Sequence, residues 1–88
     1  NYHWNVKGPN FLSLHQLFQD IYEDLATAID ELAERVRSLG ERVPASFTHF
    51  QKQKTISDGN ENFDADNMVK DLLKSHHEIL ETYKKALE

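Results

Sequence analysis

One uninterrupted amphipathic pattern constrains the fold of this chain more than any other feature. A Gly-Pro pair at positions 8 and 9 breaks the chain before the pattern, Asn10 can cap its first turn, and Gly40 follows its end. Between these signals the apolar residues recur in steps of three and four, which indicates one helical face. The sequence therefore predicts a continuous helix over residues 11–39, whose apolar positions are Phe11, Leu14, Phe18, Ile21, Leu25, Ile29, Leu32, Val36 and Leu39.

A second amphipathic pattern begins near Asp64, a good N-cap residue, and runs to the end of the chain. Between the two patterns, Pro44 can open a short helix over residues 45–50, whose two phenylalanines would pack as a lid. Asp58 and Gly59 then predict a turn. The apolar side of the second long helix is expected to consist of Met68, Leu72, Leu73, His76, Ile79, Leu80, Tyr83 and Leu87.

Two long amphipathic helices cannot cover both of their apolar faces against each other, because each face needs more than one neighbour. We therefore predict an all-α four-helix bundle. This chain would carry the end of the first helix, the long second helix, a short connecting helix and the third helix. Residues 1–88 form a single domain in this interpretation. The chain opens without a Met and closes inside a helical pattern, so we expect it to be a truncated portion of a longer protein.

Composition excludes several classes of function. The 88 residues contain no Cys, which excludes disulfides, zinc–cysteine sites and thiol catalysis. No apolar run approaches the roughly 20 residues that a membrane span needs, so we expect no membrane partner. The formal net charge is −5, which argues against tight DNA binding through this segment, because such binding rests on Lys and Arg neutralising phosphates.

Four residues carry a possible chemistry: His3, His15, Asp30 and Glu34. Imidazoles and carboxylates together form a ligand set suited to Fe(II) and Fe(III). On a helical wheel with His15 at zero, Asp30 falls at about 60° and Glu34 at about 100°, so they share one sector beside the apolar face. Taken singly, each feature is more often ordinary. An Asp–Glu pair four residues apart is usually a solvated helix face, and a lone His is usually no ligand.

Helix length then limits how these groups can meet. Fifteen rises separate His15 from Asp30, or roughly 22 Å along the axis, whereas donors on one ion lie within about 4 Å of each other. A second, antiparallel copy related by a two-fold axis near Tyr22 and Glu23 would bring His15 of one chain beside Asp30 of the other. Such an interface would create two identical sites per dimer.

The residues around these positions resemble a known family. The segment HWNVKGPNF at residues 3–11, the Leu14–His15 pair, and DELAERVRSLG at residues 30–40 are similar to the Dps miniferritins, the DNA-binding proteins from starved cells of the ferritin-like superfamily. The similarity is specific over residues 2–40 and loose from Pro44 onward. It implies that His3 and His15 come from one subunit, and that Asp30 and Glu34 come from its two-fold partner.

The same resemblance implies the function. Family members form hollow dodecamers in the cytoplasm or nucleoid. They oxidise Fe(II), usually with hydrogen peroxide, and deposit ferric mineral inside, so the expected function is a ferroxidase that stores and detoxifies iron. His3, His15, Asp30 and Glu34 would then be both the catalytic and the metal-binding residues. Trp4 would adjoin the site and serve packing, which we favour, or electron supply.

One position departs from the family pattern. The family commonly places an Asp four residues after the second His, and this chain has Gln19 there. A neutral amide stabilises Fe(III) less than a carboxylate does, so we expect the second iron position to be weak. Two rival interpretations stay open: a non-enzymatic helical oligomerisation module, and a DNA-protecting module in which the metal site is weakened.

Overall fold

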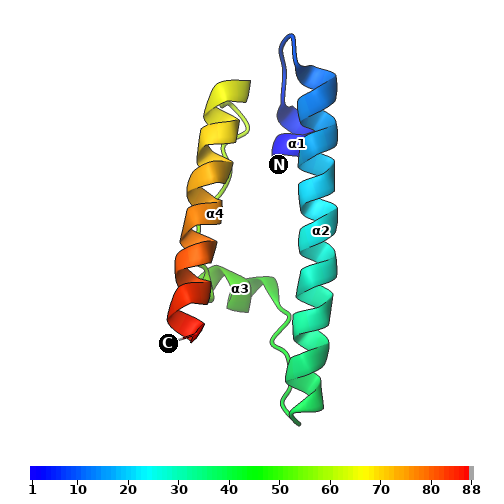
Figure 1. Ribbon diagram of the computed structural model, residues 1–88, viewed down its shortest axis with the longest axis vertical. Coiled ribbons are helices and arrows are strands. Elements are labelled where there is room, and N and C mark those ends of the chain that lie inside the picture. Colours follow the sequence, from blue (N-terminus) through cyan, green and yellow to red (C-terminus); the bar gives the residue numbers. More distant parts are fainter. Residues whose placement is uncertain (88) are drawn as a thin grey trace.

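A computed structural model describes residues 1–87, and four helices make up its regular structure (Figure 1). A short helix α1 (Tyr2–Asn5) precedes the long helix α2 (Phe11–Ser38). The connecting helix α3 (Phe47–Gln53) follows, and α4 (Ala65–Leu87) completes the described chain. The predicted all-α architecture and the order of its elements are confirmed.

The two long helices form the frame of the molecule. In Figure 1, α2 and α4 stand side by side and run in the same direction, and α1 lies against the N-terminal part of α2. Helix α3 lies between the lower parts of the two long helices. The chain after α3 returns along α4 to the end where α1 lies. This route brings the start of α4 close to the start of the described chain.

Glycines close both ends of α2 as the sequence predicted. Gly8 has φ 115° in the turn before the helix, and Gly40 has φ 87° two residues beyond Ser38. Side chains with a Cβ rarely adopt such angles. Asn10 is the N-cap residue of α2 as predicted, and its backbone carbonyl, not its side chain, accepts the bonds from Ser13 Oγ and Leu14 N–H.

The connecting helix starts and ends later than predicted. Ser46 caps it, since its hydroxyl oxygen accepts a hydrogen bond from the His49 N–H at 3.1 Å. Pro44 and the residue after it therefore lie outside the helix. The expected lid is also wrong, because Phe47 is 91% exposed.

The buried core lies at one end of the molecule. Its members Tyr2, Val6, Phe18 and Met68 come from α1, the segment after it, α2 and α4. The Asp64 carboxylate accepts a bond from the Asn67 N–H at 2.9 Å, so the predicted cap of α4 is confirmed. Farther along both long helices, most apolar residues are exposed. In residues 1–87 no helix combines the length and the apolarity required to cross a membrane.

Candidate metal centre

The turn between α1 and α2 folds the two histidines of the N-terminal segment onto each other. His3 Nδ1 lies 2.8 Å from the carbonyl oxygen of His15, and His15 Nδ1 lies 2.7 Å from the carbonyl oxygen of His3. The two rings stack with their centroids 3.8 Å apart. Residues twelve positions apart thus form a reciprocal pair, with both side chains half-buried.

These two bonds determine which ring nitrogen of each histidine is available. A carbonyl oxygen only accepts hydrogen bonds, so the Nδ1 atom facing it must carry the proton. In the neutral imidazole the Nε2 atom is then unprotonated and keeps its lone pair. A backbone carbonyl on the far nitrogen is the arrangement that orients metal-binding histidines generally. The pair therefore offers two oriented nitrogen donors, which fits a transition-metal ion.

Aromatic rings hold the pair from both sides. Phe11 stacks on His15 at a centroid distance of 5.1 Å, and Tyr22 meets His3 edge-on at 5.2 Å. Both aromatic residues belong to α2, so the helix itself limits rotation of the imidazoles. The nitrogen donors are consequently in place before any metal ion arrives.

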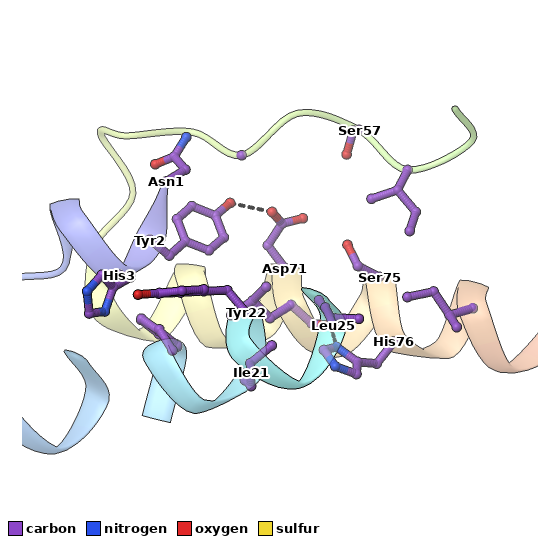
Figure 2. Close-up of a pocket in the computed structure, with 15 residues that line it drawn as sticks. Asn1, Tyr2, His3, Ile21, Tyr22, Leu25, Ser57, Asp71, Ser75 and His76 are labelled. Atoms are coloured by element: carbon purple, nitrogen blue, oxygen red, sulfur yellow. Dashed lines mark hydrogen bonds between the residues drawn. The ribbon is translucent and has the colours of Figure 1, made fainter. Parts of the chain in front are cut away.

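A tether from α1 to α4 fixes the helical turn that carries His3 (Figure 2). The Tyr2 hydroxyl donates a hydrogen bond to the Asp71 carboxylate and accepts one from the Asn60 N–H at 3.2 Å. The Tyr2 ring also packs against Phe18 and Phe63. Burial raises the pKa of Tyr2 above its ordinary value, and the hydrogen bond to Asp71 raises it further. The phenol therefore stays protonated and keeps the bond over the physiological range.

A groove of about 300 Å³ lies between α2 and α4 beside this tether. Tyr2, His3 and Asp71 line one end, and Leu25 and His76 lie toward the other, as Figure 2 shows. Most of its wall is apolar carbon from the two long helices. The groove therefore shares His3 with the predicted ligand set, whereas His15, Asp30 and Glu34 do not line it.

The two carboxylates are not brought to the histidines. Asp30 and Glu34 lie in the C-terminal half of α2, and both are exposed. Since α2 is one unbroken helix, Asp30 stays roughly 22 Å along the axis from His15. Within residues 1–87, no three His, Asp or Glu side chains gather closely enough to hold a metal ion. The structure thus unites His3 with His15 and leaves Asp30 and Glu34 apart from them.

Three further residues lie near the histidines in the sequence: Gln19, Asp20 and Trp4. Gln19 is half-buried one turn after His15, and its amide nitrogen donates to Glu23 Oε1 at 3.0 Å. Asp20 accepts a bond from the amide nitrogen of Gln16 at 2.9 Å. Trp4 is 81% exposed, so the packing role expected for it is not filled within this chain.

Comparisons with known proteins identify the family to which this chain belongs. The family model for the ferritin-like domain matches residues 1–88. The chain belongs to the ferritin-like family. The DNA protection during starvation protein 2 of Bacillus anthracis is 35% identical over 88 residues, which are 100% of this chain and 60% of that protein. This ferritin-like chain therefore spans about 60% of the length of that curated relative.

Comparison with solved structures leads to the same family. Dps from Staphylococcus aureus superposes with a TM-score of 0.94 at 34% identity, covering 98% of this chain and 58% of that one. The Dps protein of Vibrio cholerae O1 gives a TM-score of 0.90 at 34% identity, covering 96% of this chain and 53% of that one. That structure is described as a member of a broad superfamily of ferritin-like diiron-carboxylate proteins. The resemblance to Dps proteins and the predicted ferritin-like fold are confirmed.

Sequence reasoning missed two contributions to the site. The tether between Tyr2 and Asp71 joins residues 69 positions apart, and no local pattern signals such a contact. The bond from Gln19 to Glu23 could have been found, because side chains four residues apart on a helix are neighbours.

Proposed function

We propose that the full-length protein binds Fe(II) at a site shared between two copies of the chain and oxidises it, storing and detoxifying iron. The observation that carries this proposal is the reciprocal pair of His3 and His15, in which each Nδ1 atom faces a backbone carbonyl and each Nε2 atom is left as the possible metal donor. Oriented imidazoles bind Fe(II), and carboxylates favour Fe(III). The shared site would therefore need His3 and His15 together with Asp30 and Glu34.

The straightness of α2 supports a second copy as the source of the carboxylates. Two antiparallel α2 helices related by an axis near Tyr22 and Glu23 would place His15 of one copy at the level of Asp30 of the other. The small residues Ala26 and Ala33 lie in the same sector of the helix, which allows the backbones to approach closely. Exposed apolar residues on both long helices are a further reason to expect a homo-oligomer, and the family suggests a dodecamer.

The chemistry follows from holding the ions as a pair. Two Fe(II) ions give up one electron each to one hydrogen peroxide molecule, and the products are two Fe(III) ions and two hydroxide ions. Reduction of peroxide by a single ion would instead release a hydroxyl radical. Asp30 and Glu34 can bind one ion or bridge two, because they lie four residues apart on one helix. The ligand set thus couples iron oxidation to removal of peroxide.

A DNA-protecting role is the second candidate, and the name of the Bacillus anthracis relative favours it. The formal net charge of −5 disfavours direct contact of this segment with phosphates. We therefore propose that any protection of DNA acts through removal of iron and peroxide, in the cytoplasm or nucleoid. A purely non-enzymatic oligomerisation module is the remaining alternative.

Stopped-flow absorbance after mixing Fe(II) and hydrogen peroxide with the full-length protein tests the proposal. The double variant Asp30→Asn/Glu34→Gln should lose most of the fast oxidation, because neutral amides stabilise Fe(III) less than carboxylates do. A matched control is Asp24→Asn/Glu31→Gln, which removes the same number of charges from exposed positions in a different sector of α2. Equal rates for all three proteins would exclude the ferroxidase function and leave the oligomerisation module.

A further inference from the structure

Gln19 occupies the position at which a carboxylate would strengthen the second iron position, and its surroundings suggest how the chain manages without one. The side chain is half-buried one turn after His15. On the helical wheel it lies at about 40°, inside the sector that holds Asp30 and Glu34. Gln19 therefore faces the proposed site although its amide carries no charge.

The hydrogen bond to Glu23 determines which way the Gln19 amide points. The amide nitrogen lies 3.0 Å from Glu23 Oε1. An ionised carboxylate only accepts hydrogen bonds, so the NH₂ group must face Glu23. The amide is planar, and its oxygen Oε1 is therefore directed away from Glu23. A freely rotating glutamine would present nitrogen and oxygen alternately, and only the oxygen can bind a cation.

Glu23 also changes the electronic character of that oxygen. A donor group that bonds to a charged acceptor becomes more polarised, because hydrogen bonds in a chain strengthen one another. The carbonyl oxygen of Gln19 thus carries more negative charge than an isolated amide. Glu23 itself lies eight rises from His15, or roughly 12 Å along the axis, which is too far to share an ion with it. Its Oε1 atom accepts a hydrogen bond from the Gln19 amide, so Glu23 is linked to the ligand sector through Gln19.

The other nearby carboxylate does not serve this purpose. Asp20 is rotated by about 100° from Gln19 on the helix. Its Oδ1 atom accepts a bond from the Gln16 amide at 2.9 Å. Glu23 is therefore the carboxylate linked to the ligand sector.

We propose that Glu23 is a positioning residue that orients the Gln19 carbonyl oxygen as a neutral ligand of the second iron position. The pair of Gln19 and Glu23 does the work of one carboxylate, with the charge held one helical turn from the metal ion. This inference rests on the proposed function. It adds a named residue to the site and a reason for the glutamine.

Anaerobic calorimetric titration of the full-length protein with Co(II), followed by visible absorption, tests the inference without turnover. We expect the parent to bind two Co(II) ions per site, the second more weakly. Glu23→Gln should weaken the second ion by roughly tenfold or more and leave the first unchanged, as losses of orienting partners usually do. The control Asp24→Asn removes the same charge from the next residue, which lies about 100° away on the helix, and should bind both ions like the parent.

The exchanged pair Gln19→Glu/Glu23→Gln separates positioning from a merely structural effect. It keeps the net charge and moves the carboxylate to the ligand position, so the second ion should bind at least as tightly as in the parent. The inference is overturned if Glu23→Gln binds both ions like the parent, if the exchanged pair fails to recover the second ion, or if the parent binds only one ion. A parent that binds no Co(II) at all refutes the proposed function, and with it this inference.

Discussion

The two halves of α2 differ in how far contacts within one chain hold their side chains in place. In the N-terminal half, His15 is locked to His3 by two hydrogen bonds, and Phe18 lies in the buried core. In the C-terminal half, Asp30 and Glu34 are exposed, as is the apolar residue Ile29 beside them. One chain therefore completes the imidazole half of the proposed site and leaves the carboxylate half open.

This difference matches what each ligand type needs. An imidazole binds through one nitrogen of a specified tautomer, so its ring and its proton must be fixed in advance. A carboxylate offers two equivalent oxygens and binds in several geometries, so it tolerates a less prepared position. A shared site in which one chain supplies rigid histidines and another supplies adaptable carboxylates follows naturally from this contrast.

Subunit mixing gives the largest expected effect and tests the contrast directly. His15→Ala and Asp30→Ala should each lower the rate of Fe(II) oxidation by about 100-fold or more, since the loss of orienting partners alone costs 10–100-fold. Refolding the two variants together in equal amounts should restore about a quarter of the parental activity. Half of the dimers are mixed, and each mixed dimer has one intact site of two.

The control for this experiment mixes two variants damaged in the same half. His3→Ala refolded with His15→Ala should recover nothing, because every site then lacks one histidine. Stopped-flow absorbance measures both mixtures. Equal recovery in the two mixtures, or none in the first, would contradict the sharing of the site between copies.

Removing the tether between Tyr2 and Asp71 should have an effect of intermediate size, on the stability of the chain. Tyr2→Phe removes the hydrogen bonds to Asp71 and Asn60. It should lower the free energy of unfolding by about 1–2 kcal/mol at neutral pH, as measured by chemical denaturation with Tyr83→Phe as an exposed control.

The same variant has a pH signature. Burial raises the pKa of Tyr2 above 10.0, so the unfolded chain ionises first as the pH rises. The contribution of Tyr2 to stability is complete below a pH of about 10 and is lost as the pH climbs through the pKa of the folded chain. Tyr2→Phe should therefore show a smaller decline in stability above pH 10 than the parent. Identical alkaline declines would contradict a raised pKa of Tyr2 in the folded chain.

Substitutions at two glycines should have the smallest effect, and they form a closely matched pair of variants. Gly8→Ala and Gly40→Ala each place a Cβ at a positive φ in open space, and each should cost about 1 kcal/mol of stability. Only Gly8 lies in the turn that carries His3 to His15. Calorimetric titration with Co(II) should show weaker binding for Gly8→Ala alone. Equal losses for both variants would show that the turn does not set the histidine geometry.

The limits of the long helices could be predicted from the sequence because residues close to each helix end determine them. The Gly-Pro pair, Gly40 and Asp64 each specify a backbone angle or a cap within a few residues of a helix end. The start of α3 was misplaced because Pro44 only tolerates a first helical turn, whereas the Ser46 hydroxyl satisfies the His49 N–H. A helix limit is thus predictable where a residue requires a particular backbone angle or supplies a cap. It is less predictable where a residue, such as Pro44, is only compatible with a helix start.

The site was only partly predictable for a similar reason. Residue types placed His3 and His15 in one site, but their reciprocal bonds depend on the geometry of the intervening turn. The contact between Tyr2 and Asp71 depends on how α1 and α4 pack, and neither residue signals the other in the sequence. The sequence therefore predicts candidate ligands, and tertiary packing determines which of them are prepared for an ion.

The reciprocal bonds between His3 and His15 also bear on how such a chain can change over generations. Each ring bonds to the main chain of the other residue, and the two rings also stack with their centroids 3.8 Å apart, so a replacement at one position removes the surface against which the other ring packs. If the proposed iron chemistry is abandoned in a descendant, the two histidines should be lost together. Lineages that keep one should keep its mate and the turn between them, so this segment should be inherited as a block.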